Sequence, residues 1–417
     1  MKKKVLIIGN SATAYALGKK LSVNNDIYIA PGNDLMKEFA VCLDIRENSV
    51  MELLEFVLEN DIDLTIPVSK TTIDTNIVEI FSQNNQQIFA PDFNASQIAI
   101  DKAFAKKLLY KLHIPTPKFG IFEKQSMAQD YIRNLRVPFV IKTNENSSAT
   151  VLSSSQEAKY ILDTYFSTKN QKVIIEDYIW GSPFSFYVIT DGYKALPFGS
   201  SIVYKHSLEG DGGQLTTGMG AVSPNYKLSF DNENYLMNEV IYPTLNYLEQ
   251  FGNAYLGILG LNGILTDNGN LTILGYQTFM QDCDTTAILS NIDEDLIKLF
   301  EACIVGSFSD EIDEIKFCDM SATSIVLRCN NHDNNQNIIK NLDNLDDETC
   351  IDFYPNVNKN RYLEYEAQHG SNLIITSSAS TVAKSTEKAY NQVEIVDFQG
   401  KAYRKDICSI NRNYASF

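Results

Sequence analysis

The sequence predicts an α/β protein with an N-terminal parallel-sheet domain (1–100), a central α+β domain (101–319) and a C-terminal α+β domain (320–417). Two observations support this fold class. In the first hundred residues, short apolar runs alternate with helical patterns, which is typical of a parallel sheet. Further on, paired apolar runs flank short turns, which is typical of antiparallel hairpins. A smaller subdomain is expected within the central domain, at about 116–190.

Composition and charge exclude several classes of protein. The formal net charge of −17 argues against a nucleic-acid groove, which needs a basic stripe. Seven widely spaced cysteines without a C-x-x-C pair are typical of a reducing compartment. The apolar run Val5–Ile8 is too short for a signal peptide, and no apolar stretch reaches transmembrane length. We therefore expect a cytoplasmic monomer or homodimer that binds neither nucleic acid nor a membrane.

The N-terminal elements alternate between strands and helices. Strands are expected at 5–8, 27–29, 64–67 and 88–90. Ser49 and Glu52 have the spacing of a capping box, so a helix should begin there. Ligands of such sheets bind beyond the carboxyl ends of the strands, which makes Gly9 and Asn10 candidates. Gly9 lacks the two partner glycines of the dinucleotide fingerprint, and this excludes NAD.

The central domain begins with a helix that Asp101 can cap. A strand ending in Lys142 and a strand ending near Glu176 and Asp177 follow, and then come two hairpins. The hairpins are expected at 186–198 and 255–276, a long helix at 233–251 and a further helix at 296–304.

Glycine is concentrated in the stretch 210–224. Glycine allows backbone N–H groups to approach a ligand closely, so this stretch is interpreted as a substrate loop. Asp211, Thr216 and Thr217 would supply acceptors and hydroxyl groups. The alternative is a flexible surface loop.

Several motifs together carry a resemblance to a known family. They are Asp101–Phe104, the strand ends at Lys142 and at Glu176–Ile179, Thr217–Pro224 and Arg404–Ile407. In this order they resemble phosphoribosylamine–glycine ligase (glycinamide ribonucleotide synthetase), of the ATP-grasp superfamily, over essentially the whole chain. The resemblance implies a pre-ATP-grasp N-terminal domain, a central ATP-grasp domain, and ATP-dependent ligation of glycine to phosphoribosylamine in purine biosynthesis.

The resemblance also implies site residues. For the nucleotide they are Lys102, Lys142, Glu176, Asp177 and Ile179. For a small-molecule substrate (phosphoribosylamine, glycine or a relative) they are Gly9, Asn10, Lys205, Asp211, Thr216, Gly218, Met219, Gly220 and Asp282. No catalytic residue is assigned.

The departures from the family lie where the chemistry would occur. The metal-binding glutamate of the family reads Gly275, its anion-binding arginine reads Phe279, and the phosphate loop at 143–150 has neither glycine nor lysine. ATP binding is therefore expected without a Mg²⁺ site, and the four histidines show no metal-ligand spacing. Three alternatives follow: a weak ligase or one with a changed substrate, a non-catalytic paralogue, or an ATP-independent binder of a phosphoribosyl or amino-acid ligand.

Overall fold

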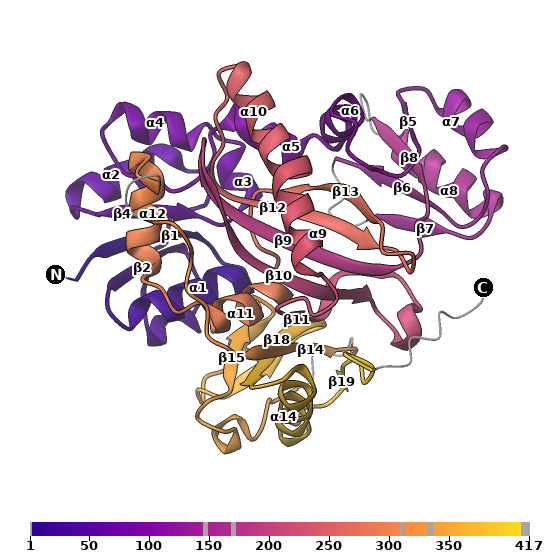
Figure 1. The fold of residues 1–417 in the computed structure, drawn as a ribbon. Helices are drawn as coiled ribbons and strands as arrows, with labels where there is room; N and C mark the ends of the chain where they lie inside the picture. The colour runs from indigo at the N-terminus through magenta and orange to yellow at the C-terminus, as the bar shows by residue number, and fades with distance from the viewer. Residues whose placement is uncertain (1, 145–148, 168–171, 309–311, 332–336, 410–417) are drawn as a thin grey trace.

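The computed structural model describes residues 2–144, 149–167, 172–308, 312–331 and 337–409. A parallel sheet near the N-terminus and a small antiparallel sheet lie on opposite sides of a long central sheet (Figure 1). The mixed α/β class that the sequence predicts is confirmed, including the N-terminal parallel sheet. No helix in the described ranges is long and apolar enough to cross a membrane.

The N-terminal sheet has the strand order β3-β2-β1-β4, with all pairs parallel. Its strands are β1 (Lys4–Gly9), β2 (Asp26–Pro31), β3 (Val41–Cys42) and β4 (Leu64–Pro67). The helical segments of this part are α1 (Ala12–Ser22), η1 (Met36–Glu38), α2 (Val50–Glu59), α3 (Lys70–Ile73), α4 (Ile77–Gln83) and α5 (Phe93–Ile100). The carboxyl end of β1 leads directly into α1, whose N-cap is Ser11.

Two local predictions in this part were wrong. The segment 88–90 forms only an isolated bridge from Ile88 to Thr65. Helix α2 begins after Ser49 as expected, but the Ser49 side chain makes no capping hydrogen bond, because ψ at Ser49 is 64° rather than extended. The predicted start of α2 was still correct, because the buried apolar residues of the helix begin at Val50.

The small sheet has the order β5-β8-β6-β7 and is antiparallel. Its strands are β5 (Phe119–Phe122), β6 (Phe139–Thr143), β7 (Thr150–Leu152) and β8 (Val173–Asp177), and it is covered by α7 (Gln125–Ile132) and α8 (Ser155–Tyr165). Helix α6 (Lys102–Lys111) leads into this subdomain. The Asp101 carboxylate caps α6 by accepting from the backbone N–H groups of Ala103 and Phe104, at 2.9 and 3.2 Å.

The long sheet joins the central and C-terminal parts of the chain. Its order is β13-β12-β9-β10-β11-β14-β18-β15, with β19 on β14. The strands are β9 (Ser182–Asp191), β10 (Ala195–His206), β11 (Leu215–Ser223), β12 (Leu256–Leu265), β13 (Leu271–Gln277), β14 (Ser321–Cys329), β15 (Cys350–Phe353), β18 (Gly370–Ala379) and β19 (Lys401–Ala402). Strand β9 belongs to this sheet, although the expected subdomain at 116–190 would include it. The segment after residue 320 extends the same sheet through β14.

Helices cover both faces of the long sheet. They are α9 (Phe230–Tyr235), a π-helical segment η3 (Leu236–Ile241), α10 (Tyr242–Gln250), α11 (Asp282–Asn291), α12 (Leu296–Val305) and α14 (Val382–Ile395). Segments α9, η3 and α10 run on without a break, which matches the long helix expected at 233–251. The short remaining elements are η2 (Glu209–Asp211), η4 (Leu342–Asn344), β16 (Val357–Lys359) and β17 (Tyr365–Ala367).

The glycine-rich stretch is largely a strand, so its interpretation as a loop was wrong. Strand β11 pairs with β10 on one side and with β14 on the other. A Cβ at Gly218 would lie 2.3 Å from the Cys283 sulfur, and one at Gly220 would lie 2.7 Å from the Ser324 carbonyl oxygen. These glycines therefore allow close packing against α11 and β14.

We predict that Gly220→Ala lowers the free energy of unfolding by about 1–3 kcal/mol, because the contacted Ser324 oxygen is backbone and cannot rotate away. Urea denaturation measures the loss. Gly212→Ala is the matched control, since its nearest contact would be at 3.4 Å. That control should shift stability by no more than about 0.5 kcal/mol. Equal stability of Gly220→Ala and wild type would contradict the packing role.

Candidate functional site

A cavity of about 580 Å³ lies where the N-terminal sheet, the small sheet and the long sheet meet. One end is formed by α6, β6 and β8 with parts of β9 and β13, and the other by β10, β11 and the segment that follows β13. Apolar side chains line much of the first end, including Val140, Ile174, Phe184 and Leu274. The volume and the mostly apolar wall with a few polar groups are typical of a small-molecule site.

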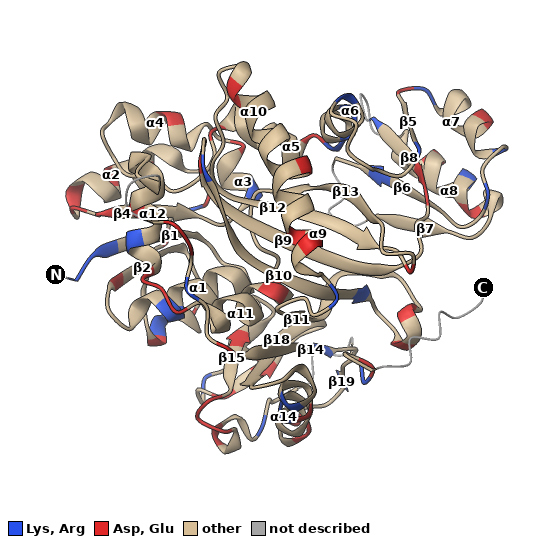
Figure 2. Ribbon diagram, in the orientation of Figure 1, with Lys and Arg blue, Asp and Glu red and all other residues tan. Residues whose placement is uncertain are grey.

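Lysine side chains converge on one carboxylate at the first end of the cavity. Glu176, at the end of β8, is buried and forms ion pairs with Lys106 of α6, at 2.7 Å, and with Lys142 of β6. The Lys106 amine also donates to the Thr116 hydroxyl at 2.8 Å. Lys102, one turn before Lys106, donates to the Thr143 carbonyl. Figure 2 shows lysine and arginine positions on α6 and beside β6 in blue.

Burial changes the proton affinity of these groups. The pKa of the Lys102 amine is about 8, lowered mainly by burial and also by the charges of Lys142 and Lys70. Burial also lowers the pKa of Lys106, although Glu176 opposes that shift. The pKa of Glu176 stays below its usual value because the two ammonium groups outweigh its own burial. The cluster therefore carries net positive charge that an anionic ligand can neutralise.

The second end of the cavity is polar and lies beneath the β10–β11 hairpin. Lys205 is partly buried there, and its amine lies 3.4 Å from the Asn262 side-chain oxygen. Burial lowers the pKa of Lys205. Thr216 also lines this end, and its hydroxyl donates to the Lys205 carbonyl at 2.9 Å.

Asp282 connects α11 to the N-terminus of α1. Its carboxylate accepts from the Thr13 backbone N–H at 2.9 Å and from the Thr13 hydroxyl at 2.8 Å. Burial raises the pKa of Asp282, and the bonds from Thr13 oppose that shift. The N-terminus of α1 thus already holds a carboxylate supplied by the chain itself.

The sequence-predicted site residues divide into two sets. Those that line the cavity are Lys102, Lys142, Glu176, Asp177, Ile179, Lys205, Thr216 and Asp282. Those that are not among the lining residues are Gly9, Asn10, Asp211, Gly218, Met219 and Gly220. Asp211 instead forms an ion pair with the buried Arg404 at 2.9 Å.

Sequence reasoning missed Lys106, which lies at the centre of the lysine cluster. The signal was available, because Lys106 follows Lys102 by four residues on a helix and so shares its face. It also missed Ser11 and Thr13, which line the cavity just beyond Gly9 and Asn10.

Mg²⁺ prefers oxygen ligands with free lone pairs in octahedral geometry, and the carboxylates near the cavity already make bonds within the protein. Glu176 is neutralised by lysines, and Asp282 is bonded to Thr13. Asp284 is buried behind the wall, where its carboxylate accepts from Tyr187 and Ser201 at 3.0 and 3.2 Å. Within the described ranges, no group of three or more His, Cys, Asp or Glu side chains could hold a metal ion.

The expected phosphate loop lies partly outside the described residues, since 145–148 are not described. The neighbouring Asn144 is described. Its side-chain oxygen accepts from the Lys102 backbone N–H at 2.9 Å, which anchors the start of this segment to α6.

Comparison with known proteins gives a consistent result. The family model of the phosphoribosylglycinamide synthetase N domain matches residues 3–99, and that of its ATP-grasp (A) domain matches residues 100–285. The phosphoribosylamine–glycine ligase of Clostridium acetobutylicum is 27% identical, over 97% of this chain and 99% of its own. That of Neisseria meningitidis serogroup B is 29% identical, over 98% of this chain and 100% of its own.

A solved structure agrees with these matches at the level of the fold. The crystal structure of phosphoribosylamine–glycine ligase from Thermotoga maritima superposes with a TM-score of 0.80 and 22% identity. The superposition covers 97% of this chain and 100% of the other.

We predict that Glu176→Gln destabilises the protein by about 3 kcal/mol at pH 7, because it leaves buried ammonium groups without a counter-charge. The destabilisation depends on pH because the pKa of Lys106 in the folded protein lies below its unfolded value of 10.5. The deficit should therefore be largest at low pH and shrink as pH rises toward that value. Denaturant titrations between pH 6.5 and pH 9.5 measure it.

The double variant Glu176→Gln/Lys106→Met serves as the control for this prediction. It removes one of the stranded ammonium groups and should recover part of the stability. A loss of stability in Glu176→Gln that does not depend on pH would argue against an electrostatic origin. A double variant that is less stable than the single variant would do the same.

Proposed function

Since the chain belongs to the phosphoribosylglycinamide synthetase family, we propose that it is an ATP-grasp ligase of the phosphoribosylamine–glycine type. Such a ligase activates a small carboxylate with ATP and transfers the acyl group to an amine, here in purine biosynthesis. The observation that carries the proposal is the lysine cluster around Glu176, which lies beside an apolar wall in a cavity of sufficient size.

The two ends of the cavity suggest a division of roles. The first end would hold ATP, with the base against Val140, Ile174 and Leu274 and the phosphates near Lys102 and Lys142. The second end would hold the small-molecule substrate. Residues there include Lys205, Thr216 and Asp282, which supply both donors and an acceptor.

The reaction should be slow, because parts that neutralise transition-state charge are missing. Gly275 lines the cavity where the family resemblance implies a metal-binding glutamate, and Phe279 where it implies an arginine. A single donor or metal contact of this kind typically contributes about 10²–10³-fold in rate. Lysine bound to phosphate acts as a point charge and does not replace the bridging geometry of a metal.

The cysteines support a place for this ligase in the cytoplasm. None of the seven forms a disulfide in the described ranges, which is the state kept by a reducing compartment.

The proposal is tested by calorimetric titration of ATP with and without Mg²⁺, beside a phosphate-release assay with glycine and phosphoribosylamine. We expect similar ATP affinity in both titrations and turnover far below the usual range of about 1–10³ s⁻¹. No ATP binding under either condition would reject the ligase proposal. Fast, strongly Mg²⁺-dependent turnover would show that other residues hold the metal.

We predict that Gly275→Glu raises phosphate release at least tenfold and makes it depend on Mg²⁺. A Cβ built on Gly275 meets no atom within 4 Å, so a longer side chain has space there. Gly275→Gln is the control, since it has the same size without the charge. If both variants behave alike, the missing carboxylate does not limit the rate.

We predict that ADP affinity falls as pH rises from 7 to 9. The pKa of Lys102 is about 8, so its ammonium group loses its charge across this range. At the higher pH, ADP binding therefore requires the Lys102 amine to take up a proton. The heat of binding near pH 8 should therefore depend on the ionisation enthalpy of the buffer. Lys102→Arg, which stays charged, should reduce both effects.

The exposed Lys107 provides a matched control on the same helix. Lys107→Arg should leave the pH profile of ADP binding unchanged. A pH profile that is the same in wild type and Lys102→Arg would contradict the role given to Lys102.

A further inference from the structure

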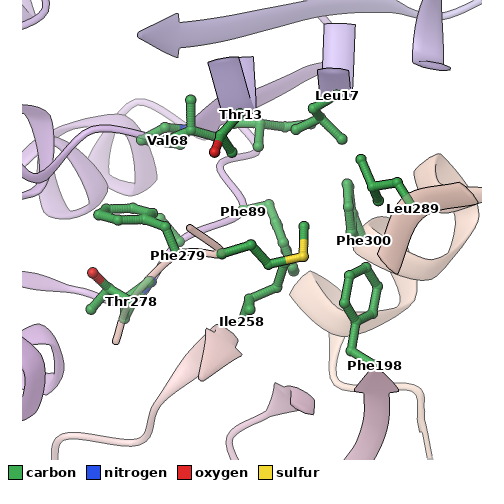
Figure 3. A pocket seen from close by; sticks show the side chains of 15 residues that line it. Thr13, Leu17, Val68, Phe89, Phe198, Ile258, Thr278, Phe279, Leu289 and Phe300 are labelled. Carbon is green, nitrogen blue, oxygen red and sulfur yellow. The ribbon is translucent and has the colours of Figure 1, made fainter. Parts of the chain in front are cut away.

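A second, much smaller cavity lies between the N-terminal sheet and the long sheet (Figure 3). Its volume is about 30 Å³, and its walls are almost entirely apolar. Leu17, Ile258 and Phe198 line it, and Phe89 and Phe300 close one side with rings stacked 4.1 Å apart. Apolar cavities of this kind stay dry and accept apolar groups.

This small cavity adjoins the main one, and we call it the side pocket. Thr13, Val68, Thr278, Phe279 and Met280 line both cavities. Figure 3 shows Thr13 and Val68 on one wall, with Thr278 and Phe279 facing them from the other. A short apolar group on a ligand in the main cavity would need to pass only between these shared side chains to reach the side pocket.

Polar acceptors lie next to the shared wall. Gln281 follows Met280 and lines the main cavity, and its side-chain oxygen is buried without a hydrogen-bond partner among the described residues. The Asp282 carboxylate is the next side chain along. A buried acceptor without a partner is costly, so a donor on the ligand is expected there. Together a neutral oxygen and a carboxylate favour an ammonium group.

The three features fit the three parts of an α-amino acid. The ammonium group would donate to Gln281, the side chain would enter the apolar pocket, and the carboxylate would turn toward Lys205 in the main cavity. The size of the pocket sets the length of the side chain. A volume of about 30 Å³ holds two water-sized groups, which corresponds to a methyl or an ethyl group.

We propose that the amino-acid substrate of this protein carries a short aliphatic side chain, of the alanine or 2-aminobutyrate class, in place of the hydrogen of glycine. The proposal rests on the proposed ligase function and names the substrate class of its second site.

The test is calorimetric titration of glycine, L-alanine, L-2-aminobutyrate and L-leucine into the protein saturated with ADP. One or two carbon atoms in an apolar pocket typically change affinity by about 10–200-fold. We expect L-alanine or L-2-aminobutyrate to bind at least tenfold more tightly than glycine, and L-leucine to bind more weakly than either. Equal or tighter binding of glycine, or no binding by any of the four, would overturn the proposal.

The titration of ADP alone keeps this test separate from that of the ligase function. If ADP binds and glycine is preferred, the side pocket is not a substrate pocket and the ligase proposal stands. If ADP does not bind, the ligase proposal fails, and the amino-acid inference that rests on it fails as well.

Variants of the pocket provide a second test. Ile258→Phe fills it and should remove the preference for L-alanine over glycine while leaving ADP affinity unchanged. Met280→Ala enlarges it and should shift the preference toward L-leucine, which keeps the inference testable if Ile258→Phe does not fold. Gln281→Met removes the acceptor and should lower the affinity for every amino acid at least tenfold. Unchanged selectivity in a folded pocket variant, or unchanged affinity in Gln281→Met, would refute the placement.

Discussion

The arrangement of the main cavity depends on the ion pairs of Glu176. This carboxylate lies on β8 of the small sheet and binds Lys142 on the neighbouring strand and Lys106 on α6. Two ammonium groups could not remain buried together without it. The same contact therefore fixes how the small sheet sits against α6 and directs lysine charge toward the cavity. A structural ion pair and the proposed ligand site are here one set of atoms.

The long sheet supplies the rest of the frame. Strands β9 to β13 border the main cavity, while β14, β18 and β15 continue the same sheet into the C-terminal part. Helix α11 packs on β11, where the Gly218 backbone comes close to Cys283, and this contact places Asp282 against the N-terminus of α1. Close glycine packing and a helix-capping carboxylate thus join two parts of the chain at the wall of the site.

The sequence predicted the elements that depend on local patterns. The continuous apolar run of β1 and the Asp101 cap of α6 need only near neighbours, and both were identified. The stretch 210–224 was misjudged because glycine composition does not distinguish a ligand loop from a strand that packs closely. That distinction depends on Cys283 and Ser324, which are distant in sequence. The residues that line the cavity were likewise predicted only where their signal is local in the sequence. The strand-end lysine Lys142 was found, whereas the side pocket forms from segments of two domains and has no local signature.

The composition of the site separates binding from catalysis. Lysines attract the phosphates of ATP in the ground state about as strongly as in the transition state, and such uniform binding does not raise the rate of the chemical step. Acceleration requires charges placed where charge develops during transfer, which is the role of a bridging metal or an arginine fork. At the positions where the family resemblance implies these groups, the chain has Gly275 and Phe279, which line the cavity. Phe279 also forms part of the wall shared with the apolar side pocket. In the proposed assignment, the residue that would weaken anion binding at this wall also gives it the apolar surface that would suit a substrate with an aliphatic group.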